Sequence, residues 1–158
     1  WDTVVGLPRG YDGTQLVYGI NCGREIILDP KVVEFKRNVR DPSNEKSARC
    51  MLIDNHTISN IKPRPNTHLI IEAQVLKRVN GEQVEEPYGW TVLDLFDINR
   101  LKTGIYKLPL YYAPTNPDIQ LVQLPNYQKI PNAYIYLRVN HPGLENEIHR
   151  IRPNGGST

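Results

Sequence analysis

Apolar and polar residues alternate along much of the chain in the short runs that are typical of β-strands. Between positions 133 and 139, Ala, Ile, Leu and Val occupy every second position, and Tyr134, Tyr136 and Arg138 occupy the positions between them. This period of two places the apolar set on one face of a strand and the other set on the opposite face. The segment therefore predicts a half-buried strand of an antiparallel sheet.

Similar runs rich in Val, Ile, Leu and Tyr occur throughout the chain, separated by Gly and Pro residues that mark turns. The dipeptide Asn80-Gly81 predicts a two-residue hairpin turn, because a type I′ turn needs a positive φ at both positions. The predicted strands cover residues 15–20, 25–28, 31–36, 49–54, 68–79, 89–96, 105–110, 119–124 and 133–139.

The spacing of these turns predicts one fold class for the whole chain. Many short strands indicate an all-β domain, which we expect to be an antiparallel β-sandwich of about eight strands. At most one short helix is predicted, near the C-terminus, where Leu144, Ile148 and Ile151 repeat at helical spacing. Residues 1–153 are expected to form a single domain, and residues 154–158 a flexible tail or linker.

Length and charge are those of one ordinary globular domain. The chain has 158 residues, of which 39% are hydrophobic and 23% are charged, and its formal net charge is +2. This balance gives no electrostatic reason to expect a nucleic-acid partner. No apolar run approaches the ~18 residues of a membrane-spanning helix. Because the chain begins at Trp1 rather than at a Met, we expect a fragment of a larger protein. If that protein carries a coiled coil, we expect it to oligomerise outside this segment.

The chain carries no sequence motif of an enzyme or of a metal site. The phosphate-binding glycine loop, the GxSxG nucleophile turn and the zinc-binding HExxH pattern are missing. The histidines, at positions 56, 68, 141 and 149, have no ligand spacing, and Cys22 and Cys50 lack the CxxC spacing of a zinc site. We therefore expect no catalysis, no cofactor and no bound metal. Both cysteines are expected to be reduced and buried, although a single disulfide between them remains open.

Residues 67–142 look like the second half of a C2 domain. Residues 67–75 resemble the strand before the third calcium loop, and residues 85–90 (Glu-Glu-Pro-Tyr-Gly-Trp) resemble the start of the next strand. The pattern is similar to the divergent C2 domains of ciliary and basal-body proteins, such as jouberin-like and coiled-coil-containing ciliary proteins. Its signature here is Gly-Trp at 89–90, Leu-Phe at 95–96, Leu-Lys-Thr-Gly at 101–104 and Leu-Pro-Leu-Tyr-Tyr-Ala-Pro at 108–114. The resemblance implies a C2-like sandwich with Trp90 in its core, in a cytoplasmic scaffold of the cilium, basal body or cytoskeleton.

The chain has other residues at the positions that the resemblance aligns with the calcium ligands of C2 domains. The positions that carry the paired aspartates in calcium-binding C2 domains are occupied here by Val75 and Lys77. Calcium needs six to eight oxygen ligands, and the remaining carboxylates, Asp12, Glu85 and Glu86, do not supply the central pair. We therefore expect no calcium binding.

Without catalytic or calcium residues, the chain is expected to be a non-catalytic docking module that mediates protein–protein interaction within a larger cytoskeletal or ciliary scaffold. Tyrosines suit a binding surface because each ring contributes a large contact area at a low entropic cost. An equally open interpretation is that most of them are half-buried strand residues with a hydrated hydroxyl. The candidate partner-binding residues are Tyr111, Tyr112, Tyr127, Tyr134 and Tyr136.

The alternative function is calcium-independent binding to anionic membrane lipids. Its basis is two basic clusters, in which each side chain contributes about 1 kcal/mol near an anionic leaflet. Acidic residues are interspersed among them, and the sequence leaves open whether the clusters share a face. An extracellular or carbohydrate-binding domain, which the Asn55-His56-Thr57 sequon would suit, is a more distant alternative. The candidate lipid-binding residues are Lys36, Arg37, Arg40, Lys77 and Arg78.

Overall fold

The computed structural model describes residues 1–141 of the chain, and residues 142–158 lie outside the described part. The helix predicted around residues 144–151 and the tail predicted at residues 154–158 fall among the latter.

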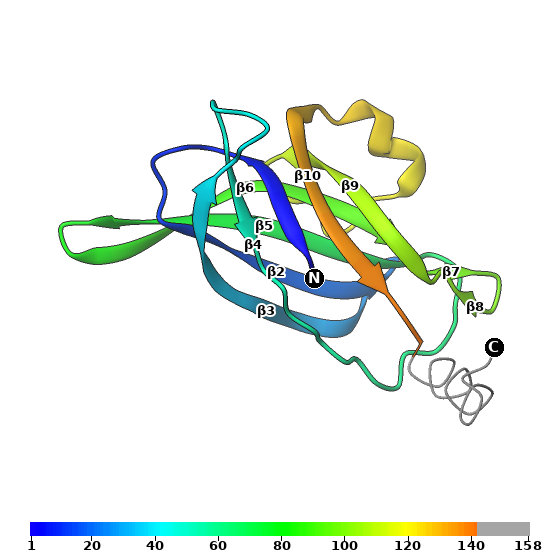
Figure 1. The fold of residues 1–158 in the computed structure, drawn as a ribbon. Coiled ribbons are helices and arrows are strands. Elements are labelled where there is room, and N and C mark those ends of the chain that lie inside the picture. Colours follow the sequence, from blue (N-terminus) through cyan, green and yellow to red (C-terminus); the bar gives the residue numbers. More distant parts are fainter. Residues whose placement is uncertain (142–158) are drawn as a thin grey trace, which may run out of the picture.

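The described chain is built almost entirely from antiparallel strands (Figure 1). The only helix among residues 1–141 is a short 3-10 helix, η1 (Leu121–Asn126). The strands are β1 (Thr3–Leu7), β2 (Gly13–Cys22), β3 (Glu25–Arg40), β4 (Ala48–Met51), β5 (Thr67–Val79), β6 (Glu82–Asp94), β7 (Phe96–Asp97), β8 (Arg100–Leu101), β9 (Gly104–Tyr112) and β10 (Lys129–Val139).

Eight of these strands close into a barrel in the order β1-β10-β9-β6-β5-β2-β3-β4, while β7 and β8 form a separate two-stranded sheet. The barrel has four short seams, in which only two or three residues pair: β1–β10, β1–β4, β3–β4 and β6–β9. Between β6 and β9 the paired residues are Gly89 with Tyr112 and Trp90 with Tyr111, and β4 pairs with only the last residues of β3. The antiparallel all-β class is confirmed, whereas the division into the two sheets of a sandwich is not.

Most predicted strands are present, with different bounds. The predicted strands at 25–28 and 31–36 are parts of one long strand, β3, and the sequence pattern missed β1. β1 is interrupted by Gly6, which has a φ of +74°, and this residue hides the alternation. The Asn80-Gly81 hairpin is confirmed, because both residues have positive φ and Val79 pairs with Glu82. This β5–β6 hairpin extends from the barrel as an arm (Figure 1).

The strand predicted at residues 119–124 is wrong, because this segment forms a turn and η1. Pro117 and Pro125 flank the apolar residues, and a proline removes a donor that a strand ladder needs. The apolar side chains pack instead on the outer face of the barrel, where Ile119 lies against a cluster of Ile70, Trp90, Val92 and Tyr111.

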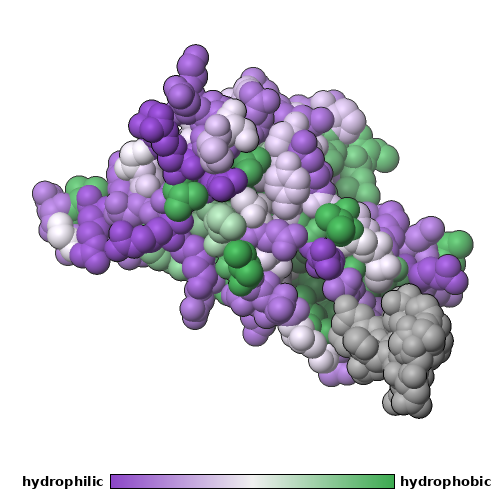
Figure 2. Space-filling model, viewed as in Figure 1, coloured by the Kyte–Doolittle hydropathy of each residue, from purple (hydrophilic) through white to green (hydrophobic). Residues whose placement is uncertain are grey.

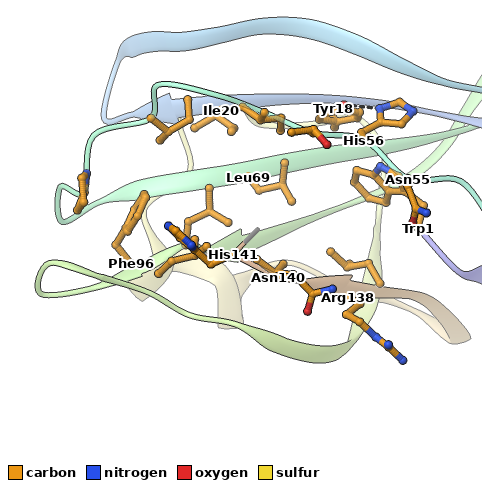
Figure 3. Close-up of a pocket in the computed structure, with 18 of the residues that line it drawn as sticks. Trp1, Tyr18, Ile20, Asn55, His56, Leu69, Phe96, Arg138, Asn140 and His141 are labelled. Atoms are coloured by element: carbon orange, nitrogen blue, oxygen red, sulfur yellow. Dashed lines mark hydrogen bonds between the residues drawn. The ribbon is translucent and has the colours of Figure 1, made fainter. Parts of the chain in front are cut away.

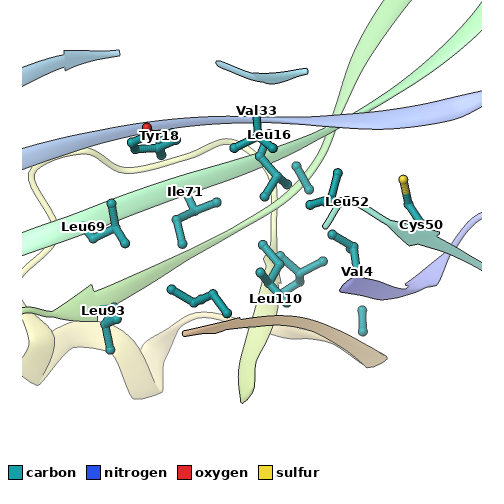
Figure 4. Close-up of a cluster of buried hydrophobic side chains, with 14 of the residues drawn as sticks. Val4, Leu16, Tyr18, Val33, Cys50, Leu52, Leu69, Ile71, Leu93 and Leu110 are labelled. Carbon is teal, nitrogen blue, oxygen red and sulfur yellow. The ribbon is translucent and has the colours of Figure 1, made fainter. Parts of the chain in front are cut away.

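The main core fills the barrel interior with side chains from every large strand (Figure 4). Val4, Leu16, Ile71, Leu110 and Ile135 are each 1% exposed or less. In β10 the alternation is confirmed, since Ala133, Ile135 and Leu137 are buried and Tyr134, Tyr136 and Arg138 face outward. Trp90 is fully buried as predicted, although it lies in the outer cluster rather than in the barrel interior.

Candidate functional site

The five candidate tyrosines do not form one surface. Tyr111 is buried, and its ring lies 5.6 Å from the Trp90 ring. Tyr127 packs edge-on against Trp90 at 5.2 Å, and its hydroxyl accepts a hydrogen bond from Asn116. Tyr111 and Tyr127 therefore stabilise the outer cluster, and Tyr111 is not available to a partner. Tyr112 is 46% exposed at the end of β9.

Tyr134 and Tyr136 lie together on the outer face of β10. The Lys107 Nζ of the neighbouring strand lies 4.2 Å from the centre of the Tyr134 ring and 5.9 Å from that of Tyr136. This arrangement follows from the register, in which Tyr136 pairs with Lys107 and Tyr134 with Pro109. A cation over two aromatic faces is held by the ring quadrupoles, so the exposed Lys107 and the two half-buried tyrosines form one group on the outer face.

The register extends this group into a larger surface, which we call the tyrosine face. Tyr136 pairs with Thr3, which pairs with Met51, and Tyr134 pairs with Val5. On the far side, Arg138 pairs with Ile105. The tyrosine face consists of Thr3, Val5, Arg49, Met51, Ile105, Lys107, Pro109, Tyr134, Tyr136 and Arg138.

The tyrosine face is cationic and has no carboxylate among its ten residues. Its charged side chains are Arg49, Lys107 and Arg138, and the buried Nε of Arg49 has no hydrogen-bond partner within the described residues. Its exposed apolar side chains are Met51, at 46%, and Ile105, at 71%. Viewed from this side, hydrophobic side chains are scattered among polar ones over the front strands (Figure 2). Such a surface suits contact with an acidic, partly apolar partner.

The two basic clusters of the lipid hypothesis lie close together. Lys36 of β3 pairs with Thr14 of β2, and Arg37 pairs with Gly13. On the other side of β2, Thr14 pairs with Val75 of β5 and Gly13 pairs with Leu76. Lys77 and Arg78 follow directly after these residues. The clusters therefore come near each other at the base of the arm, on β3 and β5, which are separated by β2.

Acidic residues share this region. The Lys77 Nζ lies 3.4 Å from the Glu86 carboxylate, which also accepts a 2.6 Å hydrogen bond from the Tyr11 hydroxyl. The Tyr11 hydrogen bond, aided by Lys77, lowers the pKa of Glu86, so this carboxylate stays ionised and offsets the lysine. Arg40 lies 3.9 Å from Glu45, and Glu82 and Glu85 lie on the same arm. The basic character of the arm is therefore largely neutralised.

The two positions that the C2 resemblance aligns with calcium ligands supply no free carboxylate. Val75 is 2% exposed in the middle of β5, and Lys77 is paired with Glu86. Within residues 1–141, no three side chains drawn from His, Cys, Asp and Glu gather into a group that could hold a metal ion.

We predict that calcium does not stabilise this domain. The melting temperature in 1 mM calcium should equal that in excess chelator to within about 1 °C, because a ligand raises stability only when it binds the folded state. Differential scanning calorimetry measures both values. A rise of several degrees with calcium would contradict the prediction.

The two cysteines differ in their environment. Both are free thiols. Cys50 is buried as predicted, and burial raises the pKa of its thiol to about 11. Cys22 is only half-buried, against expectation, and its Sγ lies 3.6 Å from the carbonyl of Pro65.

His68 is buried beside the half-buried Asp94, whose Oδ2 accepts a hydrogen bond from Lys102, in an arrangement that the sequence did not indicate. It pairs with Asp94 across β5 and β6, and its Nε2 lies 3.9 Å from the Asp94 Oδ1. Neither atom has a hydrogen-bond partner within the described part of the chain. Burial lowers the pKa of His68, and this effect outweighs the opposing attraction of the Asp94 carboxylate.

This lowered pKa predicts a loss of stability in mild acid. The unfolded chain takes up a proton on His68 near its ordinary pKa of about 6.5, whereas the folded chain does so only at a lower pH. The free energy of unfolding should therefore be fully retained above that pKa and decline as the pH falls below it. Urea denaturation at several pH values between 7.5 and 5 measures the slope. His68→Gln should flatten it, and an unchanged slope in this variant would contradict the assignment.

The fold and the surface together define a β-barrel domain whose described residues show an exposed cationic face and no metal cluster. Among them, no helix has the length and apolar character needed to cross a membrane. The model of the CCDC17 C-terminal domain family matches residues 1–147. The chain therefore belongs to this family of coiled-coil-containing proteins.

Proposed function

We propose that this domain is a non-catalytic docking module that binds a protein partner through the tyrosine face. The observation that carries the proposal is the Lys107–Tyr134–Tyr136 group on a surface with three cations and no carboxylate. Aromatic residues and Arg are enriched in the central parts of protein interfaces. Tyr134 and Tyr136 supply contact area, and the cations select the charge of the partner.

The partner segment that fits this face is acidic and carries some apolar side chains. Glu or Asp residues would pair with Arg49, Lys107 and Arg138, and apolar residues would cover Met51 and Ile105. Electrostatic attraction of this kind mainly accelerates association and excludes basic partners.

The cellular setting that we propose is a cytoplasmic scaffold of the cilium, basal body or cytoskeleton. It is supported by the resemblance of residues 67–142 to divergent C2 domains of ciliary proteins and by membership of a family of coiled-coil-containing proteins. The antiparallel barrel is compatible with the all-β class that the resemblance implies, so a C2-like ancestry is part of this proposal.

A charge reversal on the tyrosine face tests the docking proposal. Binding of a fluorescein-labelled peptide of alternating Glu and Leu should weaken about tenfold in Lys107→Glu at low salt, equivalent to about 1.4 kcal/mol. The difference should shrink at high salt because exposed charges are screened. Fluorescence anisotropy measures both affinities, and a peptide of alternating Lys and Leu is the charge control.

Arg78→Glu is the matched control variant, because Arg78 is exposed on the arm and makes the same change in charge. It should leave peptide binding unchanged. Equal weakening in Lys107→Glu and Arg78→Glu would mean that net charge, and not the tyrosine face, governs binding.

Calcium-independent binding to anionic lipid is the second candidate, favoured by the proximity of the two basic clusters at the base of the arm. Co-sedimentation with phosphatidylserine vesicles that Arg78→Glu abolishes and Lys107→Glu spares would support this candidate over the first. The pairing of Lys77 with Glu86 makes it the weaker of the two.

A further inference from the structure

One end of the barrel interior is not filled by core side chains. A cavity of about 680 Å³ opens there between β2, β5 and β10 and the segment that links β4 to β5. Figure 3 shows Tyr18 and Ile20 on one side of it and Phe96, Asn140 and Arg138 on the opposite side. The volume is within the range of about 300–1,000 Å³ that is typical of small-molecule sites, which often occupy the mouths of β-barrels.

The inner wall of the cavity is apolar. It is formed by residues whose neighbours belong to the main core, among them Ile20, Leu69, Leu95, Phe96 and Leu137. These side chains are between 2% and 7% exposed, so a long aliphatic chain in the cavity would be shielded from water. Each buried CH2 group would contribute about 0.8 kcal/mol.

The rim of the cavity is polar and carries unused hydrogen-bond donors. The side chains of Asn55, Asn60, Asn99 and Asn140 line it and make no hydrogen bond with residues 1–141. None of its described lining residues is Asp or Glu. A carboxylate accepts hydrogen bonds only, and each of these Asn side chains offers amide donors, so the rim suits an acidic head group.

A hydrogen-bonded chain holds part of this rim in place. The Tyr18 hydroxyl lies within hydrogen-bond distance of the His56 Nδ1, and the His56 Nε2 lies 3.2 Å from the Asp54 carboxylate. Burial, together with the Asp54 charge, raises the pKa of Tyr18, so its hydroxyl remains protonated at neutral pH. The Trp1 ring packs 4.9 Å from Tyr18. The segment that carries Asn55 is therefore anchored on both sides.

We propose that this cavity binds a single-chain aliphatic carboxylate, with the chain inside the barrel end and the carboxylate at the amide rim. The site adjoins the tyrosine face at Arg138, which belongs to both, but its other lining residues are different. The proposal does not depend on the docking function. The probe that represents this class is dodecanoate, used below its micelle concentration.

Isothermal titration calorimetry of the intact 158-residue chain with dodecanoate tests the proposal. We expect saturable binding at one site, and at least tenfold weaker binding of hexanoate because six CH2 groups are lost. Intrinsic fluorescence should change with the same affinity, and Trp1→Phe should remove this change, because Trp1 lines the cavity and Trp90 does not.

Variants that introduce a carboxylate test whether dodecanoate binds inside the cavity. Ile58→Glu, in the cavity lining, should weaken dodecanoate binding at least tenfold, whereas Val122→Glu, on η1 and outside the cavity, should not change it. Both residues are exposed, at 37% and 83%, so both variants are expected to fold. Asn140→Asp adds a carboxylate at the rim with almost no change in shape and should also weaken binding.

Absence of saturable binding to the intact chain would overturn the proposal. So would binding that Ile58→Glu and Asn140→Asp leave unchanged, or equal affinities for dodecanoate and hexanoate. None of these results would bear on peptide binding by the tyrosine face.

Discussion

Trp90→Ala is expected to lower the free energy of unfolding by about 3–5 kcal/mol, the usual cost of truncating a large buried aromatic side chain. Trp90 is fully buried and contacts Tyr111 and Tyr127, and its indole Nε1 donates a 3.0 Å hydrogen bond to the Tyr112 carbonyl. Because this bond joins β6 to β9, the truncation removes packing at the short seam where only two residues of each strand pair. Urea denaturation measures the change.

The control for this variant is Tyr112→Ala, which truncates an aromatic residue that is 46% exposed on the same seam. It should cost about 1 kcal/mol or less. If Trp90→Ala keeps its melting temperature within a degree or two of the wild type, the outer cluster does not stabilise the barrel.

Gly6→Ala is expected to destabilise the domain by about 3 kcal/mol or more, through overpacking and backbone strain together. A Cβ atom on Gly6 would lie 2.3 Å from the carbonyl oxygen of Asn132 and 2.5 Å from the Cα of Ala133. Both are backbone atoms of β10, so only a movement of β1 away from β10 can relieve the clash. The positive φ of Gly6, +74°, adds strain for any residue with a side chain.

Gly10→Ala separates the two causes. Gly10 also has a positive φ, +92°, but a Cβ atom there would meet nothing within 4 Å. This variant should cost about 1–2 kcal/mol from backbone strain alone. Thermal melting of both variants gives the comparison, and equal costs would mean that β1 and β10 do not approach as closely as the structure shows.

The strands could largely be predicted from the sequence because they alternate in hydrophobicity with a period of two. This local signal does not report which strand edges meet, so it could not distinguish a closed barrel from a two-sheet sandwich. The segment around Ile119 shows a second limit. Its apolar residues pack on the outer face of the barrel, and a one-dimensional pattern gives the same signal for a strand as for such a covering segment.

The tyrosine face could be predicted only in part. Tyr134 and Tyr136 were indicated by their alternation with apolar residues, but Lys107 joins them through the pairing of β9 with β10. Arg49 joins through β4, which the sequence places far from β10. Cross-strand register is a property of the folded sheet, so these cations carried no signal in the sequence. Tyr111 carried the same signal as Tyr112, although only Tyr112 is exposed.

The measurement that tests the docking account most directly is an NMR titration of the isotopically labelled chain with the alternating Glu and Leu peptide. We predict that the largest backbone amide shifts map to Thr3, Val5, Lys107, Tyr134 and Tyr136, with little change on the arm. Shifts that concentrate on the arm around Lys77 and Arg78, or no shifts at all, would contradict the proposal that this domain docks an acidic partner through the tyrosine face.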